Sequence, residues 1–234
     1  MVCSPAKTMS TGAPPLAKAE HLKVVADQQA APSASDLEKV RRLDWRFLLS
    51  EPRLGCVLYY GPAGSDLLDA LETFAQQVVI YLPESPAVMN SQFDVAVAHA
   101  PSYEVLRHMA GMLAPGGTFY IEGNRTWSTG ARRSGGAGSP LRSAEAVLKA
   151  CQSLGLTDAN GHWHWPNLEG CLEMIPLGSS TAMACALARR SSDWRVRLRS
   201  RLVSWLSRRR WWSRMAPSFS VVARRKSMAR GVSV

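Results

Sequence analysis

The sequence predicts an α/β domain in which helices cover a parallel sheet. Between Leu54 and Glu122, short apolar runs alternate with segments of helical periodicity. The first two apolar runs stop at Gly61 and Pro83, as buried parallel strands do where the chain turns. An order of strand, helix and strand favours right-handed crossovers, and such crossovers pair the strands in parallel.

The elements expected in this region are four strands with helices between them. The strands are predicted at residues 56–60, 78–82, 93–98 and 118–122, and Ser65 is suited to cap the first helix. A second helix is predicted over 103–113, and Pro115-Gly116-Gly117 stops it. A further helix over 143–154 and strands at 171–177 and 218–224 are expected beyond it.

The positive charge of the chain lies in its C-terminal part. The net charge is +10, yet the residues after Ala188 carry fourteen Lys or Arg against the single acid Asp193. The preceding part is therefore slightly acidic, and the basic character belongs to one segment. The five cysteines are scattered, without a C-x-x-C pair, which excludes a disulfide framework and favours a reducing compartment.

Composition divides the chain into a leader, a domain and a tail. Residues 1–35 are rich in Ala, Pro and Ser and are expected to be a flexible leader. The domain is expected over 36–226, with a basic helical insertion at about 179–216, and 227–234 form the tail. No apolar run has the character of a signal peptide or the length of a membrane span, so a cytoplasmic protein is expected, with peripheral membrane attachment as an option.

Three segments carry a resemblance to a known family. They are Phe93–Ala100 ("FDVAVAHA"), the turn Leu113–Gly117 ("LAPGG") with the following "TFYIEG", and the final "SFSVVARRK". Together they resemble class I S-adenosylmethionine-dependent methyltransferases. The resemblance implies a Rossmann-like fold with a mostly parallel sheet, an antiparallel edge strand formed by the last segment, and helices on both faces. It also implies S-adenosylmethionine as the cofactor.

The cofactor loop departs from the family pattern. The family has an acid followed by a glycine-rich turn after its first strand, whereas this chain has Tyr60-Gly61-Pro62-Ala63-Gly64. The resemblance implies cofactor contacts from Gly61, Ala63 and Gly64, whose small size permits close approach. The family's second strand ends in an acid that binds the ribose of the cofactor, whereas this strand ends in Tyr81-Leu82, with Glu84 beyond Pro83. The resemblance implies Tyr81 and Glu84 as cofactor contacts at this position, and a solvated Glu84 is the alternative. A turn without any ligand is the alternative.

His99 is the candidate catalytic residue. It follows a predicted strand at its carboxyl end, where open α/β sheets bind ligands, and imidazole is suited to general-base chemistry. Tyr103 and Glu122 are expected near the same edge, Tyr103 as part of a substrate pocket. A hydrogen bond within a loop is the alternative role for His99.

The segment Gly161–Asn167 alternates His and Trp. His162, Trp163 and His164 are candidates for an aromatic substrate pocket over the cofactor. Two histidines at i and i+2 point to one face of a strand and could also bind a metal, but no third ligand stands at a recognisable spacing, so no metal is expected. Simple packing of the two tryptophans is the alternative.

The basic segment Arg195–Arg214 forms an amphipathic helical pattern, with Trp and Leu on one side and Arg around it. Such a helix suits binding to an anionic membrane surface or to an acidic partner, and RNA is a further alternative. An ordinary helix that packs its apolar side on the domain, with its Arg residues in solvent, is the remaining alternative.

The function expected from these patterns is methyl transfer to a small-molecule or glycan acceptor. The alternatives are a catalytically inactive scaffold or binding subunit of the same fold, and a basic module that docks on membrane or RNA.

Overall fold

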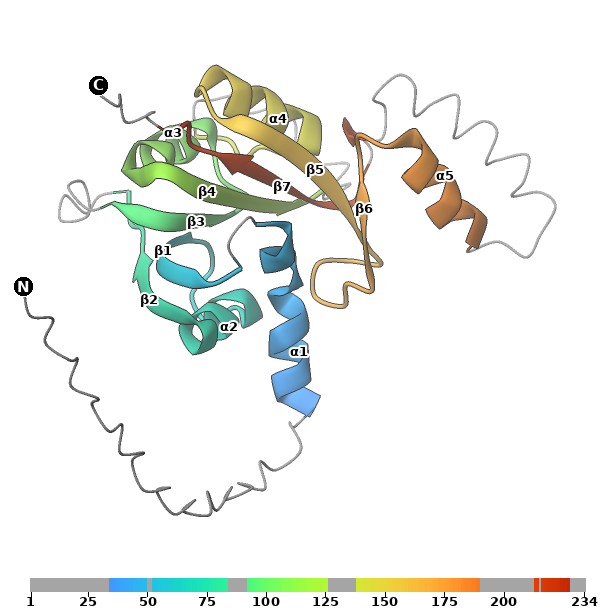
Figure 1. Ribbon diagram of the computed structural model, residues 1–234, viewed down its shortest axis with the longest axis horizontal. Coiled ribbons are helices and arrows are strands. Elements are labelled where there is room, and N and C mark those ends of the chain that lie inside the picture. The colour runs from blue at the N-terminus through green and yellow to red at the C-terminus, as the bar shows by residue number, and fades with distance from the viewer. Residues whose placement is uncertain are drawn as a thin grey trace, which may run out of the picture. The chain divides into compact units, whose positions relative to one another are not determined.

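The computed structural model of the chain describes residues 34–49, 52–83, 92–125, 138–189, 213–214 and 216–227. Along these residues the elements are α1 (Ala34–Arg42), the 3₁₀ helix η1 (Asp44–Leu48), β1 (Leu54–Tyr60), α2 (Asp66–Phe74), β2 (Ala75–Ile80), β3 (Phe93–His99), α3 (Tyr103–Met112), β4 (Leu113–Asn124), α4 (Ala144–Ser153), β5 (Thr157–Trp165), β6 (Glu173–Pro176), α5 (Ser180–Arg189) and β7 (Ser218–Arg224). The described strands form one seven-stranded sheet in the order β2-β1-β3-β4-β7-β5-β6 (Figure 1).

The strands β2, β1, β3 and β4 are parallel, as the sequence predicts. β7 runs antiparallel to both β4 and β5, and the edge strand β6 runs antiparallel to β5. The predicted Rossmann-like α/β class, with a mostly parallel sheet and an antiparallel edge strand, is confirmed.

One detail of the predicted sheet is corrected. The last segment, β7, is antiparallel as expected but lies inside the sheet, between β4 and β5. Its residues from Ser218 to Ala223 are all buried. A strand whose two faces and two edges are covered belongs in the interior, and the shorter β6 forms the edge.

Helices cover both faces of the sheet, and alternate residues of each strand feed two cores (Figure 1). On one face, Ala96 of β3 and Phe119 of β4 pack beneath α3 and α4. On the other face, Val97 and Tyr120 pack with residues of η1 and α2. This alternation follows from the two-residue period of a strand.

The strand β5 is not among the strands predicted from apolar runs, although the His and Trp alternation at its end is considered as a strand. It contains polar and small residues, such as Asp158, Asn160 and Gly161, where a buried strand normally shows an apolar run. Its position is set by pairing with β7 and β6. Tertiary contacts thus override a weak local signal here.

The predicted turn Pro115-Gly116-Gly117 lies within the first residues of β4, shortly after α3 ends at Met112. Gly116 has a φ of +82°, a backbone conformation that residues with a side chain rarely adopt. A Cβ atom on Gly117 would lie 2.9 Å from the carbonyl oxygen of Ala114 and 3.0 Å from that of Asp94. The carboxylate of Asp94 accepts a hydrogen bond from the backbone N–H of Cys56 at 2.9 Å, which fastens β3 to β1.

Several predicted segments lie outside the described residues. They are nearly all of the leader 1–35, most of the tail 227–234 and the basic segment Arg195–Arg214 apart from its last two residues, so their expected roles stay predictions. Within the described part of the chain, no helix combines the length and the apolar character needed to cross a membrane.

Candidate functional site

The sheet order reverses between β1 and β3. The chain leaves β1 toward β2 on one side and then continues from β3 to β4 on the other. In open α/β sheets, ligands bind outside the carboxyl ends of the strands at this switch point. The segments that meet here are the turn after β1, which begins at Gly61, and the end of β3 at His99.

Gly61 and His99 are in contact across the switch point. A Cβ atom on Gly61 would lie 3.2 Å from Cβ of His99 and 2.4 Å from the hydroxyl oxygen of Tyr59. The structure therefore brings two of the predicted site residues together, and only glycine fits at position 61 without displacing them.

His99 is paired with a buried carboxylate. Its Nδ1 atom lies 2.9 Å from Oε1 of Glu122, at the end of the neighbouring strand β4. The Glu122 side chain is fully buried, whereas that of His99 is 29% exposed. An ionised carboxylate accepts hydrogen bonds only, so it selects the tautomer in which Nδ1 of a neutral His99 carries the proton. The lone pair then remains on Nε2.

Two further groups hold Glu122 in place. Arg42, at the end of α1, donates to Oε1 at 2.5 Å, and its side chain is 8% exposed. The hydroxyl of Tyr120 donates to Oε2 at 3.1 Å. Three donors thus surround one fully buried carboxylate.

These partners keep Glu122 ionised. Burial by itself raises the pKa of this carboxyl, but the hydrogen bond from His99 and the charge of Arg42 outweigh burial and lower the pKa to about 2. Burial and the charge of Glu122 raise the pKa of Tyr120 well above its ordinary value, so this hydroxyl keeps its proton. The site therefore contains a permanent anion oriented toward an imidazole.

The backbone after His99 is strained. Ala100 has a φ of 45°, in the left-handed region that a residue with a side chain seldom occupies. The N–H of Ala100 donates to the carbonyl oxygen of Glu122 at 2.7 Å and so holds this conformation. Such local strain is concentrated at functional sites.

The end of α1 and the helix η1 contact the β4 residues of the site. The ring of Trp45 in η1 stacks on that of Tyr120, with 4.0 Å between centroids and 12° between planes. Arg42 and Trp45 thus come from the same short segment and reach neighbouring residues of β4. Neither residue was a sequence-based candidate, since nothing near them in the sequence indicates a partner about 80 positions away.

Polar residues continue across the sheet from this pair. In the strand register His99 is paired with Glu122, Glu122 with Ser220, and Ser220 with His162. The hydroxyl of Ser220 is hydrogen-bonded to Nε2 of His164 at 2.7 Å. Burial lowers the pKa of His164 to about 4, so its ring is neutral near pH 7.

The three predicted substrate-pocket residues of β5 fall on two faces of the sheet. His162 and His164 share the face of Ser220, whereas Trp163 packs in the core on the opposite face. The prediction that all three line a single aromatic pocket is therefore wrong, because adjacent strand residues point to opposite faces of the sheet. Among the described residues, no cluster of His, Cys, Asp or Glu could hold a metal ion.

Tyr103 lies at the start of α3 and is partly exposed. Its hydroxyl is 3.3 Å from that of Ser153 at the end of α4. No contact places it against His99 or Glu122, so its predicted place in a substrate pocket stays a prediction.

The turn after β1 has an open outer side and a filled inner side. Ala63 and Gly64 are exposed, and no atom lies within 4 Å of a Cβ built on Gly64. On the inner side the Tyr59 hydroxyl lies 2.8 Å from that of Ser65 and donates to the carbonyl oxygen of Pro62 at 3.1 Å. Tyr59 thus stands close to where the resemblance implies an acid.

Tyr81, which the sequence predicts within the second strand, lies directly after β2 and is buried. Its hydroxyl is 3.2 Å from Nδ1 of His108 in α3, and its ring lies 6.2 Å from that of Tyr60. Glu84 lies outside the described residues. The turn thus has small, exposed residues at Ala63 and Gly64 that leave its outer side open, and it has hydroxyls where the resemblance implies carboxylates.

Comparison with known proteins finds similarity in structure alone. No family model and no curated protein matches this sequence. Similar solved structures include a methyltransferase from Archaeoglobus fulgidus that depends on S-adenosylmethionine, with 13% identity, 82% of this chain and 95% of that chain covered, and a TM-score of 0.45. Another is phosphoethanolamine N-methyltransferase 2 from Haemonchus contortus in complex with S-adenosylmethionine, with 11% identity, 82% and 53% coverage and a TM-score of 0.43.

A third similar structure is the [4+2]-cyclase SpnF, with 13% identity, 87% and 86% coverage and a TM-score of 0.41. All three structures are similar to this chain at low sequence identity.

Proposed function

We propose that this protein transfers the methyl group of S-adenosylmethionine to a hydroxyl or amine of a small-molecule or glycan acceptor. The observation that carries the proposal is the contact of His99 with Glu122 at the switch point of the sheet. It places an oriented imidazole beside the turn expected to hold the cofactor.

His99 is the proposed general base. With Nδ1 bonded to Glu122, Nε2 is the atom that accepts the proton of an acceptor hydroxyl or amine. Glu122 orients the ring and stabilises the positive charge that the ring gains when it takes the proton, the role a buried carboxylate has in other histidine pairs. The 29% exposure of His99 leaves part of its ring accessible.

The turn from Gly61 to Gly64 and the residues at Tyr81 and Glu84 are proposed to hold the cofactor, which supplies an electrophilic methyl group when bound. Gly61 lies near His99, so a molecule bound along this turn at Gly61 would be close to the base. Orientation of the acceptor beside this position is the other contribution expected from the protein.

A second candidate is a binding subunit of the same fold without catalysis. The bonds of Tyr59 with Ser65 and Pro62 favour it, because they close the inner side of the turn with the chain's own hydroxyl. The two candidates differ in whether the cofactor binds.

Calorimetric titration with S-adenosylmethionine and S-adenosylhomocysteine separates them. Binding of both supports the methyltransferase, and no heat in either titration supports the binding subunit. Ala63→Leu is the better variant for locating the site, because Gly64 has a φ of +69° and a side chain there is strained whatever it contacts. Gly111→Leu is the matched control, since it adds the same side chain in open space on α3.

A further inference from the structure

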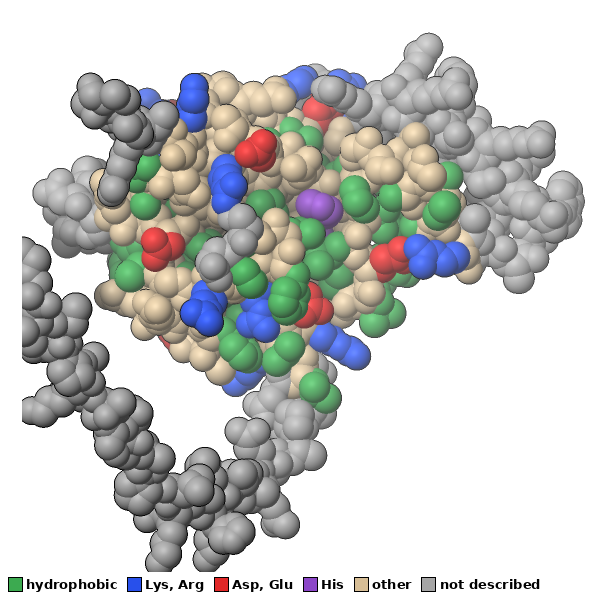
Figure 2. All heavy atoms as spheres, viewed as in Figure 1, with side chains coloured by type: hydrophobic (Ala, Val, Ile, Leu, Met, Phe, Trp, Pro, Cys, Tyr) green, Lys and Arg blue, Asp and Glu red, His purple; other side chains and the backbone are tan. Residues whose placement is uncertain are grey.

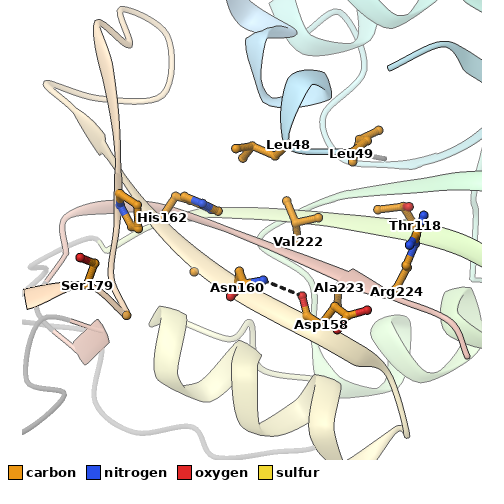
Figure 3. Close-up of a pocket in the computed structure, with 13 residues that line it drawn as sticks. Leu48, Leu49, Thr118, Asp158, Asn160, His162, Ser179, Val222, Ala223 and Arg224 are labelled. Carbon is orange, nitrogen blue, oxygen red and sulfur yellow. Dashed lines mark hydrogen bonds between the residues drawn. The ribbon is translucent and has the colours of Figure 1, made fainter. Parts of the chain in front are cut away.

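A groove of about 720 Å³ lies on the same face of the sheet as Glu122, over β4, β7 and β5. It extends from Thr118 and Arg224, at the amino ends of the parallel strands, to His162. Leu48 and Leu49 lie over it from the end of η1 (Figure 3). Its volume is within the range of small-molecule sites.

The groove combines an apolar floor and roof with mixed polar walls. Val222 forms part of the floor, opposite Leu48 and Leu49 (Figure 3). Asp158 and Asn160 line one wall, where the Asn160 amide donates to the Asp158 backbone carbonyl at 3.0 Å. Amide, carboxylate, hydroxyl and imidazole groups together offer both donors and acceptors to a ligand.

His162 marks the inner end of the groove. Its ring points toward Val222 in Figure 3, and the residue is 8% exposed. Its Nδ1 atom is buried and has no hydrogen-bond partner among the described residues. Burial lowers the pKa of this ring, so it is neutral near pH 7. Because Nδ1 is enclosed, a ligand in the groove meets only the remaining, slightly exposed part of His162.

The groove is separate from the His99 site. In the sheet register His162 is three strands from His99, with Ser220 and Glu122 between them. Tyr120, which neighbours Val222 of the floor, is covered by the stacked ring of Trp45. A ligand in the groove therefore does not reach His99, and the inference does not depend on methyl transfer.

We propose that this groove binds a neutral, hydroxyl-rich ligand such as a monosaccharide unit. Its lining carries one cation, Arg224, and one acid, Asp158, a balance that favours neither an anion nor a cation. A sugar presents hydroxyls at its edge to the polar wall and C–H groups on its faces to Leu48, Leu49 and Val222. Charged residues of both signs are also interspersed on the visible face of the described chain (Figure 2).

The test uses the full chain and saturation-transfer NMR. The probes are glucose, mannose, galactose and N-acetylglucosamine, with glucuronate and glucosamine as charged comparators. Gly178→Trp fills the groove, since a side chain at this lining residue meets no atom within 4 Å. Gly111→Trp adds the same ring in open space on α3, on the opposite face of the sheet.

At least one neutral sugar is expected to bind, and Gly178→Trp to weaken its binding by at least about tenfold, while Gly111→Trp leaves it unchanged. His162→Phe, which keeps a ring of similar size without nitrogens, is expected to weaken binding and to leave thermal stability intact. No binding of any neutral sugar to the wild-type chain overturns the proposal. Equal binding by Gly178→Trp, or stronger binding of the charged comparators, does so as well.

Discussion

Nδ1 of His99 lies 2.9 Å from Oε1 of Glu122, although 23 residues separate them in the sequence. Parallel pairing of β3 with β4 produces this contact, because it places the two residues in register at the ends of neighbouring strands. The carboxylate is fully buried and the imidazole is not, so the pair has one protected and one accessible end.

Glu122→Gln is expected to destabilise the protein by about 3–5 kcal/mol, because it leaves the buried Arg42 guanidinium without its anion. Urea unfolding at pH 7 measures this. The double variant Arg42→Met with Glu122→Gln should recover part of the loss, since it removes both charges. If the double variant loses as much free energy of unfolding as the two single variants combined, the two side chains are not coupled.

His164 is expected to make stability depend on pH. Its pKa is about 6.5 in an unfolded chain and about 4 in the folded one, where burial opposes the charge despite the nearby Glu122. The contribution is therefore complete above pH 6.5 and is lost as the pH falls toward 4, by on the order of 3 kcal/mol. Glu122 adds a similar loss only below about pH 4.5.

The free energy of unfolding at pH 5 and at pH 7 measures this dependence. His164→Gln keeps a polar group beside Ser220 but does not titrate, so its stability should change less between the two values. His162, whose pKa burial also lowers, accounts for part of any remaining dependence. An unchanged dependence in the His164→Gln variant contradicts the assignment.

Trp45→Ala is expected to cost about 3–5 kcal/mol, because it empties a buried site over Tyr120. Phe47→Ala is the matched control from the same short helix, since Phe47 is 65% exposed and should change stability by no more than about 1 kcal/mol. Thermal unfolding of both variants compares them directly. Equal losses would show that η1 does not fasten its tryptophan to the sheet.

The sequence predicts the parallel half of the sheet well, because apolar runs such as Phe93–Ala98 and the glycines at 116 and 117 are local signals. It identifies His99 from its place after a strand, but it does not rank Glu122 as the centre of the site. Strand register decides that contact, and register depends on the whole sheet.

The remaining parts of the site depend on long-range packing. Arg42 and Trp45 reach β4 from a segment before the sheet begins, and no periodicity reports such a contact. β5 is held by pairing with β7, so its polar residues give no strand signal of their own. The hydroxyl bonds of Tyr59 likewise become visible only when the turn is folded.

The central claim is that Glu122 sets His99 as a base with its lone pair on Nε2. Long-range proton–nitrogen NMR of the imidazole in the wild-type protein, recorded from pH 6 to pH 9, reports the protonation of each ring nitrogen directly. In the neutral His99 ring the proton is expected on Nδ1, with Nε2 unprotonated, and this preference is expected to be lost in Glu122→Gln. A neutral wild-type ring with its proton on Nε2 would contradict this assignment.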